Sequence, residues 1–185
     1  MAKVTVVPDV FEYVDFDNAA IVAVAERLCQ EVGLADDLAV LIDVDESTPA
    51  ARTWLESSDP FVLHVDGGAF EHTRKLRTMS NRRCADALGR LLLRVTDRMD
   101  EKFGDPPEDS ELTLAEWTAW EIYCVGRLCR LGYDGQKPRR LYQFRNRHGF
   151  TDHADHYFEL LWNGQALTWS QIVDLSNEAS LGRAS

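Results

Sequence analysis

Residues 80–103 constrain the fold of this chain more than any other stretch. Seven apolar side chains recur there at steps of three and four: Cys84, Leu88, Leu91, Leu92, Val95, Met99 and Phe103. This spacing places them on one face of an α-helix, with Arg82, Asp86, Arg90, Asp97 and Asp100 on the other face. Ser80 can cap the helix, and Gly104 followed by two prolines ends it. An apolar face of this length needs a partner in the fold.

Short β-branched or apolar runs before this helix predict strands over residues 4–7, over residues 38–44 and along FVLHVDGG after Pro60. Asp17 or Asn18 can cap a helix that ends at Gly33, and residues 46–58 read as a loop or short helix. Alternation places His64 on the opposite face of its strand from Leu63 and Val65.

Helices dominate the chain after residue 112. Thr113 and Glu116 have the spacing of a capping box and predict a helix to about residue 131. Gly126 inside it and Gly89 inside the central helix predict close helix contacts. Residues 141–144 read as a short strand, 145–151 as a loop and 152–162 as a helix. Thr168 and Gln171 then open a last helix.

These elements predict an α+β fold, in which a small sheet packs on the long central helix and a helical C-terminal lobe follows. We expect one domain over residues 1–185, with an α+β portion over 1–104 and a mainly helical portion over 112–185.

The composition is that of a soluble cytoplasmic protein. No apolar run approaches the roughly 20 residues of a membrane span, and no secretory signal is evident. The four cysteines, at positions 29, 84, 124 and 129, lie inside predicted helices without a CxxC pair. We therefore expect no membrane partner and no cofactor.

The net charge of −11 is unevenly distributed. Residues 1–66 hold 14 acidic and 3 basic residues, whereas the rest of the chain holds 17 of each. Two basic runs lack any acid, and they comprise Arg74, Lys75, Arg77, Arg82 and Arg83, then Lys137, Arg139, Arg140, Arg145 and Arg147.

The second basic run alternates with aromatic residues. Its interaction candidates are Arg139, Arg140, Tyr142, Phe144, Arg145 and Arg147. Arginines and aromatic rings together can neutralise phosphates and stack bases, which is typical of a nucleic-acid-binding surface. The alternative is that the arginines contact the acidic N-terminal third while the rings fill the core. A chain of net charge −11 favours this alternative.

Three histidines, His148, His153 and His156, lie within nine residues. His153 and His156 are spaced so that one helix face can present both to a metal, with His148 or Asp152 as a third ligand. The alternative is that they occupy the solvated first turn of a helix. The cluster therefore permits a metal-dependent hydrolase without requiring one.

The order of elements over residues 18–104 resembles the small zincin-like fold, whose central helix carries an HExxH motif. Arg94, Val95, Thr96, Asp97 and Arg98 stand where that motif would be, and they contain neither histidine. The resemblance therefore implies at most a relative without protease activity.

Signatures of other enzyme classes are also missing, since the chain has no GxSxG, P-loop or GxGxxG sequence. We therefore expect a non-enzymatic cytoplasmic binding or regulatory protein whose partner is another protein. The alternative is a metal-dependent hydrolase that uses the three histidines, and the third possibility is a nucleic-acid-binding module that uses residues 139–147.

Overall fold

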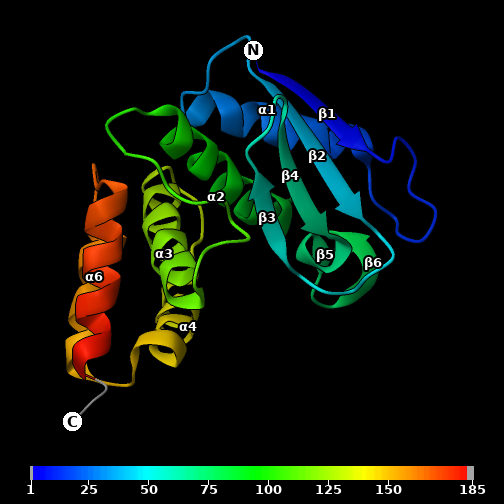
Figure 1. The fold of residues 1–185 in the computed structure, drawn as a ribbon. Coiled ribbons are helices and arrows are strands. Elements are labelled where there is room, and N and C mark those ends of the chain that lie inside the picture. Colours follow the sequence, from blue (N-terminus) through cyan, green and yellow to red (C-terminus); the bar gives the residue numbers. More distant parts are fainter. Residues whose placement is uncertain (1, 183–185) are drawn as a thin grey trace. The chain divides into compact units, whose positions relative to one another are not determined.

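The computed structural model describes residues 2–182 and has an α+β fold, as the sequence predicts. Its internal contacts divide the chain into two compact units, Met1–Thr96 and Asp97–Ser185. The boundary falls inside the central helix α2, Asn81–Met99 (Figure 1). The expectation of a single domain stays a prediction.

The first unit is built on a four-stranded sheet in the order β1-β2-β4-β3. The strands β1 (Lys3–Val7), β2 (Ala39–Asp45) and β4 (Phe61–Asp66) are parallel, and β3 (Thr53–Glu56) is antiparallel to β4. The helix α1 (Asn18–Glu31) connects β1 to β2, and Asp17 caps it by accepting from the amide of Ala20. The three predicted strands are confirmed, whereas β3 lies where a loop or short helix was expected.

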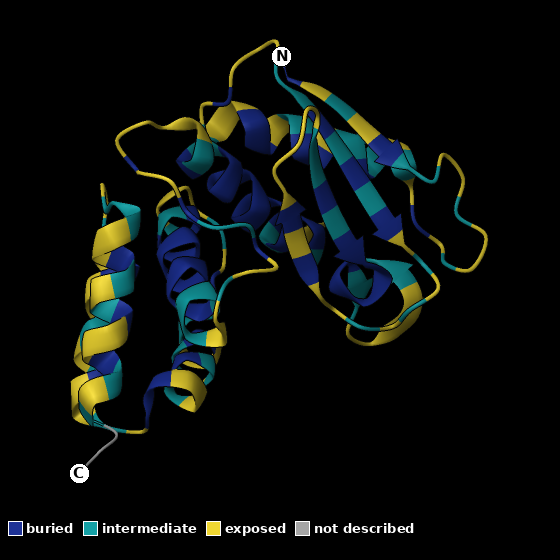
Figure 2. Ribbon diagram, in the orientation of Figure 1, coloured by how far each residue is buried: buried dark blue, intermediate teal, exposed yellow. Residues whose placement is uncertain are grey.

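Alternation along the strands gives the sheet one buried face. Along β2 every second residue is buried, and α1 and the first-unit part of α2 lie behind this face (Figures 1 and 2). The buried side chains include Val6, Val40, Ile42, Val44, Leu55, Leu63 and Val65. His64 lies on the other face, as predicted, with its two ring nitrogens each 3.1 Å from a carboxylate oxygen, one of Asp43 and one of Glu56.

A short turn and a hairpin follow β4. The turn is the 3₁₀ helix η1 (Gly67–Ala69), and the hairpin pairs β5 (Glu71–His72) with β6 (Lys75–Met79). The loop after β1 reaches this hairpin, because the amide of Asp15 donates to the carbonyl of Arg77 at 2.7 Å. The hairpin was not predicted, since β5 has only two residues and no alternating pattern.

Helix α2 does not have the exposed charged face that its sequence predicts. Arg90 is 8% exposed, Arg94 1% and Asp97 4%. Arg90 Nε donates to the carbonyl of Asp86, and Asp97 accepts bonds from α3. The periodicity located the apolar stripe but could not show that the opposite face is covered too.

The second unit is a group of four helices, α3 (Leu114–Arg130), α4 (Lys137–His148), α5 (Asp152–Asn163) and α6 (Trp169–Leu181). Helix α3 contacts each of the other three. The capping boxes of α3 and α6 are confirmed. A Cβ atom at Gly126 would lie 2.0 Å from the carbonyl oxygen of Trp162, so the close contact predicted at this glycine is also confirmed.

Helix α4 contradicts the prediction of a strand over residues 141–144 and a loop over 145–151. The physical reason is Pro138, which lies in the first turn of α4 and fixes a helical backbone angle there. The prediction did not use Pro138, although a proline at that position commonly starts a helix. No helix within residues 2–182 is both long and apolar enough to cross a membrane.

Candidate functional site

Helix α4 separates the interaction residues predicted from the sequence onto two faces. Arg139, Tyr142 and Arg147 are exposed, whereas Arg140, Phe144 and His148 are buried. Phe150 follows the helix and is 61% exposed. The exposed residues, Arg139, Tyr142, Arg147 and Phe150, are called the outer face of α4 below.

Two aromatic rings form the apolar part of this outer face. Tyr142 is 59% exposed, and its ring meets that of Phe150 edge to face, with the centroids 5.7 Å apart. Exposed aromatic side chains in mutual contact leave apolar surface in water, which often marks an interaction site. Because α4 also presents arginines here, the outer face combines apolar anchors with positive charge.

The buried residues of α4 attach this helix to its neighbours. Arg140 Nη1 donates to Glu121 Oε1 at 3.0 Å, which joins α4 to α3. Phe144 stacks on His148 with 3.8 Å between centroids, and His148 Nε2 lies 2.9 Å from Ser176 Oγ on α6. These three predicted interaction residues therefore hold the bundle together.

Arg145 pairs with an acidic residue of the next helix, α5, and so differs from the exposed arginines of the outer face. Its Nε donates to Asp155 Oδ1 at 2.7 Å. This hydrogen bond from Arg145 holds the pKa of the Asp155 carboxyl below its usual value, and the same bond raises the pKa of Arg145. The pair links α4 to α5.

The three histidines of the proposed metal cluster have separate partners. His148 is fully buried beside Ser176, whereas His153 Nε2 lies 2.9 Å from the carbonyl oxygen of Glu178. His156 contacts the ring of Tyr157. Within residues 2–182, no three histidine, cysteine or acidic side chains are placed to hold a metal ion. The structure thus offers no observation in favour of the hydrolase prediction.

Asp97, where the zincin-like comparison would place the HExxH motif, belongs to a buried network. It accepts from Trp120 Nε1 at 2.7 Å, and from Arg127 Nη1 and Nη2 at 2.7 and 2.6 Å. A bidentate pair that is further bonded to an indole satisfies the buried carboxylate. Asp97 therefore fixes α3 to the end of α2.

A second candidate site, which the sequence analysis missed, is a hollow of about 340 Å³ in the first unit. It opens where the three parallel strands end. The loop after β1 contributes Tyr13 and Val14, the loop after β2 contributes residues 46–49, and Gly67 and Gly68 follow β4. Glu71 and Arg77 of the hairpin complete it. Ligands commonly bind at the carboxyl ends of parallel strands, where loops from several strands converge.

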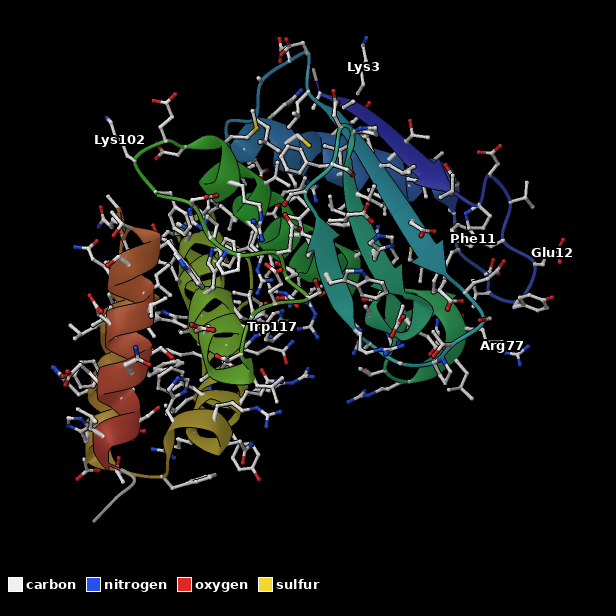
Figure 3. The ribbon with its side chains drawn as sticks, in the orientation of Figure 1. Lys3, Phe11, Glu12, Arg77, Lys102 and Trp117 are labelled. Carbon is white, nitrogen blue, oxygen red and sulfur yellow. The ribbon has the colours of Figure 1, made fainter. Side chains whose placement is uncertain are left out.

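Hydrogen bonds fix the walls of this hollow. The Glu46 carboxylate accepts from the amide of Tyr13 at 2.7 Å and from that of Glu12 at 2.9 and 3.1 Å, which ties the loop after β1 to the loop after β2. Glu71 accepts from the amide of Arg77. Figure 3 shows Glu12 and Arg77 along the same edge of the first unit. The one signal in the sequence was the Gly67-Gly68 pair directly after a predicted strand.

Comparisons with models of protein families, with curated proteins and with solved structures found no match to this chain. The resemblance to the zincin-like fold therefore stays a prediction.

Proposed function

We propose that the protein is a non-enzymatic binding protein, and that the outer face of α4 docks an acidic segment of a partner protein. The observation that carries this proposal is an exposed pair of rings, Tyr142 on α4 and Phe150 just after it, beside a helix with no acidic residue. Aromatic side chains are frequent anchors of protein interfaces, and arginine is the cation most enriched there. The cytoplasmic location predicted from the sequence accompanies this proposal.

A protein partner is favoured over a nucleic acid by the number of exposed cations. Of the five basic residues of α4, Lys137, Arg140 and Arg145 pair with Glu159, Glu121 and Asp155. That leaves at most Arg139 and Arg147, the exposed arginines of the outer face, to contact phosphates. Two phosphate contacts would give a salt dependence with a slope of only about −1.4, too little to attract a polyanion to an acidic protein. An acidic peptide needs fewer charges, because the rings contribute apolar contacts.

The burial of one histidine–serine pair supports the non-enzymatic part of the proposal. His148 and Ser176 have the geometry of a base beside a hydroxyl nucleophile, but both side chains are buried, at 0% and 1% exposure. Phe144 also covers the imidazole ring. A substrate could not reach this pair without unfolding the helices around it.

The test is a selection from a displayed library of short random peptides, followed by fluorescence titration of the enriched peptides. We expect them to combine acidic residues with an apolar residue. Tyr142→Ala should weaken binding about tenfold, as truncation of an interface aromatic does, and Arg139→Glu should weaken it through repulsion. Lys102→Glu is the matched control, because Lys102 is an exposed cation outside α4 (Figure 3).

Two outcomes would overturn this proposal. Enriched peptides that bind Tyr142→Ala as tightly as the native protein would place the interface elsewhere. Binding of mixed single-stranded oligonucleotides, lost in Arg139→Glu and Arg147→Glu, would instead identify the outer face of α4 as a nucleic-acid surface.

A further inference from the structure

Acidic side chains outnumber the basic ones around the hollow in the first unit. Glu46 and Glu71 place two carboxylates in its wall. The backbones of Gly68 and Pro49 pack closely in this wall, since a Cβ at Gly68 would lie 2.0 Å from the carbonyl oxygen of Pro49. Ser47 adds no free donor, because its Oγ donates to Asp45 at 2.6 Å. Both carboxylates already accept backbone amides, but each has about four lone-pair sites and keeps at least one of them for a ligand. A positively charged group therefore suits this wall best.

Arg77 is the one cation among the residues that line the hollow. A guanidinium pairs with a carboxylate in a bidentate geometry. A ligand that satisfies both the acceptors and the arginine must therefore carry one positive and one negative group.

The backbone of Arg77 has a conformation that is unusual for an arginine. Its φ angle is +60°, in the left-handed region where a residue other than glycine is strained. Hydrogen bonds hold this conformation on both sides, because the Arg77 amide donates to Glu71 and the Arg77 carbonyl accepts from Asp15. Glycine would take this conformation without strain. Backbone strain of this kind is typical of ligand-binding positions.

The size of the hollow limits the ligand. A volume of about 340 Å³ lies at the low end of the range for small-molecule sites, roughly 300 to 1,000 Å³. Val14 and Pro49 give part of the wall an apolar surface. The space therefore suits a molecule with one charged end of each sign and a small side chain.

We propose that this hollow binds a free α-amino acid, with its carboxylate on the Arg77 guanidinium and its ammonium group between the Glu46 and Glu71 carboxylates. The proposal is independent of the outer face of α4, because every residue that carries it lies in the first unit.

The first experiment is calorimetric titration of the whole protein with each free amino acid at about millimolar concentration. The best ligand is then compared with its amide, which lacks the carboxylate, and with its N-acetyl derivative, which lacks the ammonium group. We expect each derivative to bind about tenfold more weakly or worse, because each leaves a charged group of the site without its partner.

The second experiment uses the Arg77→Gly variant. Glycine suits the left-handed backbone, so this variant should fold and keep its melting temperature while losing amino-acid binding. Arg74→Gln is the matched control: Arg74 is an exposed arginine of the same hairpin that does not line the hollow. Tyr142→Ala should bind the amino acid as the native protein does.

The proposal fails if no amino acid binds, or if Arg77→Gly binds as tightly as the native protein. An amide that binds as well as the amino acid would leave a site for simple amines, and an N-acetyl derivative that binds as well would leave a site for carboxylates. Either result overturns the assignment to amino acids.

Discussion

Gly126 shows how a single contact can reverse the usual effect of a substitution. Within a helix, glycine to alanine normally stabilises by about 0.5 to 1 kcal/mol, because alanine loses less backbone freedom on folding. At Gly126 the added methyl would overlap the carbonyl of Trp162 on α5, so the two helices must move apart. We expect Gly126→Ala to destabilise the protein by about 1 to 3 kcal/mol in urea unfolding.

If Gly126→Ala instead stabilises the protein, the close contact between α3 and α5 is contradicted.

The Arg145–Asp155 pair should make part of the stability depend on pH. Because the hydrogen bond from Arg145 lowers the pKa of Asp155, the folded state favours the ionised carboxylate. This contribution is fully present above the unfolded pKa of aspartate, near 3.9, and disappears as the pH falls through the lower folded-state pKa. Asp155→Asn should therefore be less stable than the native protein at pH 7, and the difference should vanish in strong acid.

Urea unfolding of the native protein and of Asp155→Asn at a series of pH values measures this difference. A difference that stays constant from neutral pH to below the folded-state pKa would show that ionisation of Asp155 does not contribute.

At the scale of the element, the two faces of α4 should respond differently to truncation. Phe144 is fully buried and contacts His148 and Phe158, so Phe144→Ala should cost about 3 to 5 kcal/mol. Tyr142, two residues earlier, lies on the outer face, and Tyr142→Ala should change stability by less than about 0.5 kcal/mol. Similar losses for both variants in denaturant unfolding would contradict the helical assignment of α4.

Elements that depend on local rules were predictable, and those that depend on distant partners were not. The caps at Asp17, Thr113 and Thr168 follow from a side chain that bonds an amide three residues away, so the sequence locates α1, α3 and α6. Strand β3 has four residues and exists because it pairs with β4. No local pattern reveals such a strand.

The same distinction applies to the two candidate sites. The stretch that became α4 was identified from its arginines and aromatic rings, but its division into exposed and buried residues required the helical period, which was read as a strand. The hollow could not be predicted, because its walls come from loops after three strands and from a hairpin, far apart in the chain.

At the scale of the whole molecule, unfolding can test whether the two compact units form one domain. Trp54 is the only tryptophan in residues 1–96, and the other four lie in residues 97–185. In Trp54→Phe, tryptophan fluorescence therefore reports on the second unit alone, whereas far-ultraviolet circular dichroism reports on both. Because α2 runs through the boundary, we expect the two signals to change at the same denaturant concentration.

Two separated transitions in that experiment would mean that the units unfold independently. Native protein with Trp54 in place serves as the control, because the substitution should leave the circular-dichroism midpoint unchanged.

The contact of Gly68 with the carbonyl of Pro49 also has an evolutionary consequence. Most surface positions of this chain can change through descent without disturbing a neighbour, but no residue with a side chain fits between these two backbones. We expect any descendant of this protein that keeps the hollow to keep a glycine at the position of Gly68, the second residue after β4.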